Sequence, residues 1–377
     1  MAEMRLLDRE ELKAAIKLSD EVFLDAEQKS MGEAFPAVFS ACLNQSYGIF
    51  ENDKLISFMG VVPSVIQVGA ARLSVLSIGA VCTHPEGRGK GYAGRLFAQA
   101  KEHAERSGAA LMLVSGELPL YMKAGCLHFG SVKYYDLGAG AIQVDGEAKG
   151  FAIRERQPTD WLKIMELAAA RDVHYEQSIG DLATLIDSEG FANCVKLRHR
   201  ALVAEKQDGT LGAFAVLAVP DERESLIPPM LVEWAGEADL TASLFTHAFK
   251  KYNLSHLMVP VPWQEKELGE ALASYPFTSS HNAGTVLIVS PERLFQQLAP
   301  YRHSRVGSET NMEFEWQPDG GCLLTGLEEG AVALKPAELV SLFFDPEAKA
   351  VQESPVKYAL SPLFLAPLPY VAGLNFV

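Results

Sequence analysis

The chain has 377 residues, of which 48% are hydrophobic and 21% charged, and 48 acidic against 33 basic residues give a formal net charge of −15. A chain of this length is expected to form two or three domains. So acidic a surface repels nucleic acid and excludes it as a partner. No apolar run reaches the roughly 18 residues of a membrane helix, and the charged N-terminus is not ordered like a signal peptide. We therefore expect a cytoplasmic protein with no membrane partner.

The cysteines and histidines indicate no metal or disulfide framework. Five cysteines are widely spaced without a CxxC pair, and the nine histidines include no HExxH pattern. Structural zinc sites and disulfide scaffolds both need close, repeated spacing of such residues. We therefore expect no metal.

Residues 1–150 are predicted to alternate helix and strand. Hydrophobic periodicity predicts a helix over residues 8–23, two strands about the turn at 51–53 and a nearly apolar, buried strand over 71–85. A helix from about 91 to 106, a strand, a short helix and a closing pair of strands at 126–137 complete this unit.

Two further units are predicted. Residues 151–287 repeat the order helix, hairpin, strand, helix, strand, helix, which indicates an internal duplication. Residues 288–377 are expected to hold a capped helix, a hairpin about Asp319 and Gly320, and a helix with Pro336 in its first turn. The end of the chain is too rich in proline for a regular element and too apolar for water, so it should pack against the rest.

One segment carries a chemical signal. The stretch VCTHPEGRGKGYAGRLFAQAKEHA, residues 81–104, places four glycines and two cations before a predicted amphipathic helix. Glycines let main-chain N–H groups approach a phosphate, and a helix N-terminus adds free donors and the positive end of its dipole. Arg88 and Lys90 add charge. The stretch therefore predicts an anion site, although a flexible glycine turn is the alternative on these residues alone.

The segment resembles the acetyl-CoA-binding motif of the GNAT acetyltransferase superfamily. It lacks the GxxxxGK[ST] letters of the Walker pattern. Gly89, Gly91 and Gly94 match the letters of the dinucleotide fingerprint, but the next strand does not end in the acidic residue which that fingerprint needs. A downstream segment, LYMKAGCLHFG, resembles the second motif of the same family, with Cys126 where phenylalanine is commoner. The residues that match the two motifs are Val81, Pro85, Arg88, Gly91, Ala93, Tyr121 and Gly125.

The GNAT resemblance implies an acetyl-CoA-dependent N-acetyltransferase. The main chain of Val81, Cys82 and Thr83 would pair with the pantetheine arm of the co-substrate. Tyr121 would donate a proton to the departing thiolate, whereas the residues alone favour a tyrosine packed in the core. Buried Cys82 has no identified base partner and is not expected to be a nucleophile. The pyrophosphate would be held by the turn of Arg88, Gly89, Lys90, Gly91, Tyr92 and Ala93.

The whole chain resembles a narrower group, the enhanced-intracellular-survival (Eis) type acetyltransferases. The resemblance implies a mixed α/β chain with a catalytic GNAT domain at 1–150, a degenerate GNAT-like domain at 151–287 and a sterol-carrier-protein-like domain at 288–377. It also implies a homo-oligomer, which is a hexamer in that group. There the terminal carboxylate reaches the first domain, which makes Val377 a candidate catalytic base. The alternative is that Phe376 and Val377 only plug a hydrophobic groove.

The acceptor is predicted from the segment after the first helix, where the family lines its acceptor pocket. This segment carries Asp25, Glu27, Glu33 and Phe35. Acidic and aromatic side chains suit a cationic amine, such as an aminoglycoside-like or polyamine-like molecule or a lysine, although a solvated acidic loop is equally compatible. Two further functions stay open: a non-catalytic acyl-CoA-binding sensor or scaffold, and a lipid carrier.

Overall fold

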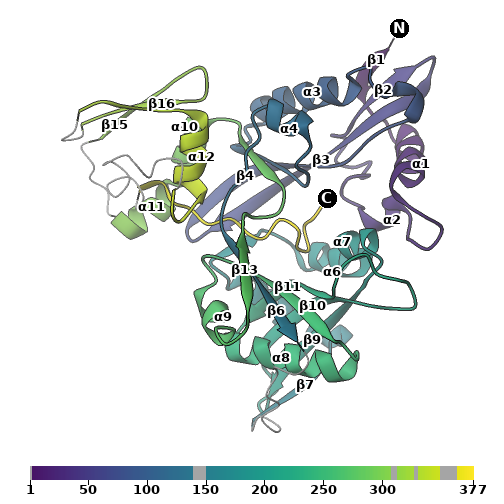
Figure 1. Ribbon diagram of the computed structural model, residues 1–377, viewed down its shortest axis with the longest axis vertical. Helices are drawn as coiled ribbons and strands as arrows, with labels where there is room; N and C mark the ends of the chain where they lie inside the picture. Colours follow the sequence, from purple (N-terminus) through teal and green to yellow (C-terminus); the bar gives the residue numbers. More distant parts are fainter. Residues whose placement is uncertain (1, 139–149, 307–311, 327–329, 349–362) are drawn as a thin grey trace.

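The computed structural model describes residues 2–138, 150–306, 312–326, 330–348 and 363–377. These residues form two seven-stranded sheets and one three-stranded sheet. Figure 1 shows the first large sheet above the second, with the small sheet to one side. In this described part of the chain, no helix is both long and apolar enough to span a membrane.

The first large sheet has the strand order β1-β2-β3-β4-β5-β14, and β8 pairs with β3. Helices α1 and α2 pack on one face, and α3 and α4 pack on the other. Its strands are β1 (Glu3–Leu6), β2 (Tyr47–Glu51), β3 (Lys54–Val68), β4 (Ala71–Thr83), β5 (Leu111–Val114), β8 (Val173–Tyr175) and β14 (Thr285–Ile288). Its helices are α1 (Glu11–Phe23), α2 (Met31–Ala34), the 3₁₀ helix η1 (Pro85–Gly87), α3 (Tyr92–Ser107) and α4 (Pro119–Lys123).

Local sequence explains most elements of this sheet. The turn between β2 and β3 uses Asn52 and Asp53 with φ of 50° and 62°, a conformation that these residues tolerate. Helix α3 is bounded by Gly91 and Gly108, which have φ of 75° and 80°. The predicted helices, the turn and the buried central strand are therefore confirmed.

The second large sheet has the order β13-β6-β12-β11-β10-β9-β7. Helices α5, α6 and α7 pack on one face, and α8 and α9 on the other. Its strands are β6 (Val132–Gly138), β7 (Phe151–Glu155), β9 (Arg198–Lys206), β10 (Leu211–Val219), β11 (Met230–Gly236), β12 (His256–Pro262) and β13 (Phe277–Ser280). Its helices are η2 (Pro158–Asp160), α5 (Trp161–Ala169), α6 (Ile179–Ser188), α7 (Gly190–Cys194), α8 (Ala238–Lys251) and α9 (Lys266–Ala271).

The two large sheets exchange a strand. Strand β6 follows the helices of the first sheet but pairs antiparallel with β12 of the second. Strand β14 follows the helices of the second sheet but pairs antiparallel with β5 of the first. The prediction that residues 126–137 close the first sheet is therefore wrong, and only an isolated bridge joins Leu127 to Val286 there. An apolar strand pattern predicts that a strand will pair within a sheet, but it does not show which of the two sheets the strand will join.

The third unit packs against the first sheet. Its strands are β15 (Glu313–Trp316), β16 (Cys322–Thr325) and β17 (Val332–Leu334), and its helices are α10 (Pro291–Gln297), α11 (Ala299–Val306) and α12 (Pro336–Phe344). Ser290 caps α10 by accepting from the main-chain N–H of Arg293 at 3.2 Å. The β15–β16 hairpin turns at Gly320, and Pro336 opens α12. These elements confirm the predicted helices and hairpin.

The last described segment, residues 363–377, is called the tail below. It leaves the third unit, runs between the two large sheets and ends in the middle of the molecule (Figure 1). Most of its apolar side chains are buried, among them Phe364, Leu368 and Leu374. The expectation that the apolar end of the chain packs against the rest is confirmed.

Candidate active site

Strand β4 contains a bulge near its end. Two of its residues, Ala80 and Val81, lie opposite the single residue Met59 of β3, where the register between the strands shifts. Ala80 has φ of 49°, in the left-handed region that is uncommon for a residue with a side chain. A bulge leaves main-chain groups unpaired and bends the strand that carries it.

Strands β4 and β5 separate at this bulge. Among the described residues, their parallel pairing ends at Ile78 and Val114, although β4 continues to Thr83. The main chain of residues 79–83 therefore has no strand partner on the β5 side. Such an edge offers N–H and C=O groups to an extended ligand that contains amides. The predicted pantetheine residues Val81, Cys82 and Thr83 all lie on this segment.

The end of the chain lies in the gap between β4 and β5. The hydroxyl of Ser115 donates to the Val377 oxygen at 2.7 Å. A Cβ atom added at Gly79 would lie 2.1 Å from the carboxyl carbon of Val377, so only glycine leaves room for this terminus. The structure thus brings a carboxylate to the point where the two strands part.

Tyr121 lies on α4, and its ring is next to the loop that follows β5. It is 4% exposed, and its ring packs against Phe97 of α3 with 5.4 Å between centroids. The ring also lies 3.4 Å from where a Cβ of Gly116 would be, and Gly116 follows Ser115. Burial raises the pKa of Tyr121 to about 12, so the phenol is protonated at neutral pH. Tyr121 and Val377 therefore contact adjacent residues of one loop.

The glycine-rich turn is open enough to hold an anion. Gly89 and Gly91 have φ of 77° and 75°, and a Cβ atom added to either would meet no atom within 4 Å. Gly91 directly precedes the first residue of α3, whose first N–H groups have no partner within the helix. The Arg88 side chain is exposed beside them. These residues fit a phosphate group.

The side chains of two other predicted residues of the turn bond to Glu51 of β2. The ammonium of Lys90 lies 2.9 Å from a carboxylate oxygen of Glu51. The hydroxyl of buried Tyr92 donates to the same carboxylate. These two contacts, with Tyr92 the larger cause, lower the pKa of Glu51. Ala93 lies in the first turn of α3, so Tyr92 and Ala93 offer main-chain groups to a ligand.

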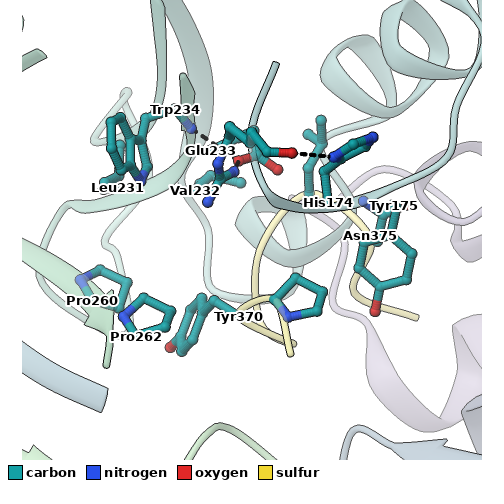
Figure 2. A pocket seen from close by; sticks show the side chains of 13 residues that line it. His174, Tyr175, Leu231, Val232, Glu233, Trp234, Pro260, Pro262, Tyr370 and Asn375 are labelled. Atoms are coloured by element: carbon teal, nitrogen blue, oxygen red, sulfur yellow. Dashed lines mark hydrogen bonds and ion pairs between the residues drawn. The ribbon is translucent and has the colours of Figure 1, made fainter. Parts of the chain in front are cut away.

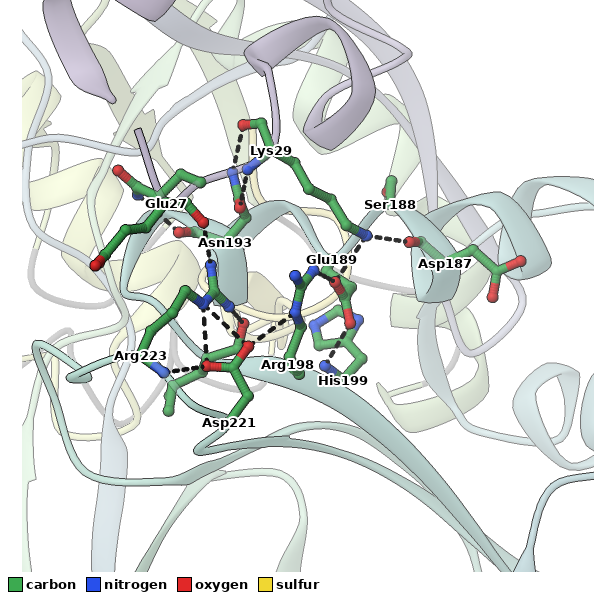
Figure 3. Close-up of polar contacts among 12 residues, drawn as sticks. Glu27, Lys29, Asp187, Ser188, Glu189, Asn193, Arg198, His199, Asp221 and Arg223 are labelled. Atoms are coloured by element: carbon green, nitrogen blue, oxygen red, sulfur yellow. Dashed lines mark hydrogen bonds and ion pairs between the residues drawn. The ribbon is translucent and has the colours of Figure 1, made fainter. Parts of the chain in front are cut away.

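Two predicted acceptor residues take part in contacts with the second unit. The carboxylates of Asp25 and Glu27 lie 2.6 and 3.0 Å from the ammonium of Lys196, which follows α7. Figure 3 shows the neighbouring network, in which Lys29 and Arg198 both pair with Glu189 at 2.7 Å. These contacts hold the loop after α1 on the second unit and already use the two predicted carboxylates.

The other predicted acceptor residues lie on or directly after α2. Glu33 is exposed, whereas Phe35 is buried in the core that includes α1. The ring of Phe35 lies 6.1 Å from that of Phe376, and the ring of Phe191 on α7 lies 5.1 Å from Phe376 on another side. The residue before the terminal carboxylate is thus held between rings from both units.

Three residues that contact the tail were not predicted. Gly79 carried a weak signal, because a single glycine inside an apolar strand often marks a bulge or a close approach of another backbone. Ser115 and Phe191 carried none, because their partners are remote in the sequence. Ser115 and Val377 are separated by 262 positions in the sequence.

The described residues support neither a nucleophilic cysteine nor a metal site. Burial raises the pKa of the Cys82 thiol to about 11, so it is protonated at neutral pH and a poor nucleophile. No group of three or more His, Cys, Asp or Glu side chains in the described ranges is placed to hold a metal ion.

Comparison with protein families identifies the first unit. Residues 3–129 match the family model described as an acetyltransferase (GNAT) domain. This part of the chain is a GNAT acetyltransferase domain. The GNAT family consists of acyltransferases that use acyl-CoA, which agrees with the open glycine turn and the separated strands. None of the curated proteins matches the chain.

Solved structures share the fold of the GNAT domain and of the units that follow it. A probable N-acyltransferase from Enterococcus faecalis has 15% identity and a TM-score of 0.69, with 98% of this chain and 99% of that chain covered. A GCN5-related N-acetyltransferase from Kribbella flavida has 12% identity, a TM-score of 0.67 and the same coverage. Eis1 from Mycobacterium abscessus has 14% identity and a TM-score of 0.62, with 96% of each chain covered. These similarities establish a common, Eis-like fold.

Proposed function

We propose that the protein is an acetyl-CoA-dependent N-acetyltransferase acting on a primary amine of a cationic small molecule, aminoglycoside-like or polyamine-like, or of a lysine. The observation that carries this proposal is the position of Val377. Its carboxyl group lies against Gly79 and accepts from Ser115 in the gap between β4 and β5, and Tyr121 lies on the adjoining loop.

The GNAT domain would bind the co-substrate along this gap. Acetyl-CoA supplies the acetyl group as a reactive thioester. The free N–H groups at the start of α3, the open turn at Gly89 and Gly91 and the cation of Arg88 would hold the pyrophosphate. The main chain of residues 81–83 would hold the pantetheine arm, which fixes the thioester relative to Val377.

Two groups of the chain would move protons. The C–N bond forms as the C–S bond breaks, so the amine must lose a proton and the sulfur must gain one. The Val377 carboxylate would accept the first, and the Tyr121 phenol would donate the second. Burial raises the pKa of Tyr121 to about 12, so the phenol carries the proton that this step needs at neutral pH.

Recognition of the amine would rest on the end of the tail. The Val377 carboxylate attracts a cation, and the half-buried ring of the preceding residue, Phe376, is an aromatic group on which an ammonium group is favoured. Asp25 and Glu27 are already paired with Lys196, so the acidic loop is a weaker candidate than the tail.

The test is release of CoA thiol from acetyl-CoA with a panel of aminoglycosides, polyamines and lysine peptides. Deletion of Val377 withdraws the carboxylate by about 3.3 Å, the length of one residue. We expect turnover with at least one amine and a loss of about 100-fold in kcat on this deletion. Tyr121→Phe should also lower kcat by about 100-fold or more, and both variants should keep their affinity for acetyl-CoA. Unchanged turnover in the folded deletion variant would refute the role of Val377. Binding of acetyl-CoA without turnover of any amine would favour a sensor or scaffold.

We also propose that the second unit is a degenerate GNAT domain and that the third is sterol-carrier-protein-like. The order β7-β9-β10-β11-β12-β6 parallels β1-β2-β3-β4-β5-β14 in the first sheet. Where the first sheet has a glycine-rich basic turn before its helix, the second has Glu237, which pairs with Lys206. A carboxylate at the start of α8 disfavours phosphate there.

A further inference from the structure

The second large sheet contains a gap at the position equivalent to the one in the GNAT domain. Strands β11 and β12 are parallel neighbours, but they pair at Met230 and Met258 alone among the described residues. Strand β11 continues to Gly236 and β12 to Pro262. The remaining edges of both strands therefore need another partner.

The tail fills this gap. Figure 2 shows Tyr370 beside Pro260 and Pro262 of β12. Val232 of β11 lines the same pocket. Leu374 lies in the same hydrophobic core as Val232. A Cβ atom added at Gly373 would lie 3.0 Å from the main-chain oxygen of Val232, so the tail passes close to the β11 backbone. The second sheet thus binds the tail where the GNAT domain would bind a co-substrate.

Side-chain amides hold the main chain of the tail. The amide nitrogen of Asn282 donates to the Pro369 oxygen at 2.9 Å, and its amide oxygen accepts from the N–H of Val371 at 3.0 Å. Asn282 is 4% exposed, so both bonds are shielded from water. Gln264 donates to the Leu368 oxygen at 2.8 Å. These bonds take the place of the strand pairing that an irregular, proline-rich segment cannot make.

We propose that the gap between β11 and β12 is a docking site for tail residues 368–375, and that Asn282 is a positioning residue that sets the location of the Val377 carboxylate. The six residues that follow Val371, up to Val377, span at most about 20 Å. Their course is guided by Gln177, which donates to the Asn375 side chain at 2.7 Å. The second sheet would then contribute to acetyl transfer by holding the tail. This role of the carboxylate rests on the proposed function, whereas the docking itself does not.

The docking and the chemistry can be tested separately in the full chain. Carboxypeptidase releases Val377 only from a terminus that has left the gap, and mass spectrometry follows that release. Asn282→Ala removes the two hydrogen bonds to the tail, each worth about a factor of five, and a third bond from the N–H of Ala283. We expect release about 30-fold faster than in the unaltered protein, with kcat lowered and the KM for acetyl-CoA unchanged.

Gln297→Ala is the matched control. This side-chain amide also bonds a main chain, accepting from the Ser74 N–H at 2.9 Å, but its bonds join α10 to β4 rather than to the main chain of the tail. We expect the Gln297→Ala variant to release Val377 at the same rate as the unaltered protein and to have the same kcat. If Asn282→Ala does not fold, Gly373→Ala replaces it, because its Cβ would crowd the Val232 oxygen and should shift the tail by a few tenths of an ångström without removing a side-chain amide.

Each result is decisive. Unchanged release in a folded Asn282→Ala or Gly373→Ala variant overturns the docking site. Faster release with unchanged kcat keeps the docking site but overturns the positioning role. Deletion of Val377 then tells whether the proposed function fails as well, because that variant withdraws the carboxylate by one residue and leaves the docked segment intact.

Discussion

The closest steric constraint on the candidate active site is the contact of Gly79 with the chain terminus, and Gly79→Ala tests it. The added Cβ atom would lie 2.1 Å from the carboxyl carbon of Val377, whereas ordinary contact begins at 3.4 Å. Since the main chain of Gly79 is held by its pairing with β3, the tail should give way by about 1.3 Å. A misplacement of about 1 Å in a reacting group costs about 100-fold in rate, or about 2.7 kcal/mol in the activation free energy.

The assay is amine-dependent release of CoA thiol, together with acetyl-CoA affinity and thermal unfolding. Gly138→Ala, on β6, is the control, because its Cβ would meet no atom within 4 Å. Combining Gly79→Ala with deletion of Val377 should be no worse than the deletion alone, because the clashing group is gone. Unaltered turnover in Gly79→Ala, or losses that add in the double variant, would refute the proposed role of the terminal carboxylate.

Two further predictions concern buried groups. Burial lowers the pKa of His199, which is 7% exposed and whose Nε2 has no hydrogen-bond partner among the described residues. The unfolded chain binds the proton more readily, so stability should fall as pH drops below about 6.5. Melting temperatures measured between pH 7.5 and 5.5 should show this loss, and His199→Gln should lessen it; an equal slope in both proteins would contradict the assignment. Burial also raises the thiol pKa of both Cys82 and Cys126 to about 11, whereas Cys42 is exposed. Iodoacetamide at pH 7.5 should therefore label Cys42 in the folded protein and spare the other two without loss of activity, and rapid labelling of Cys82 with inactivation would instead point to a nucleophilic thiol.

Much of the GNAT domain could be predicted because its features are local. The apolar run of β4, the glycine turn and α3 follow one another in the chain, so periodicity and composition are enough to place them. The short helix that carries Tyr121 was predicted for the same reason. The side-chain contacts of this stretch could not be predicted, because Lys90 and Tyr92 bond to Glu51, which lies on β2.

The sequence by itself determined the order of helices and strands, the glycine turn and the apolar character of the tail. Only the tertiary structure decided that β6 and β14 change sheets, that Asn282 holds the tail, and that Val377 ends beside Gly79 and Ser115. The physical reason is that period and composition show which face of an element is buried, while the partner that buries it is selected by packing over the whole fold. Contacts across 262 positions leave no local pattern from which they could be predicted.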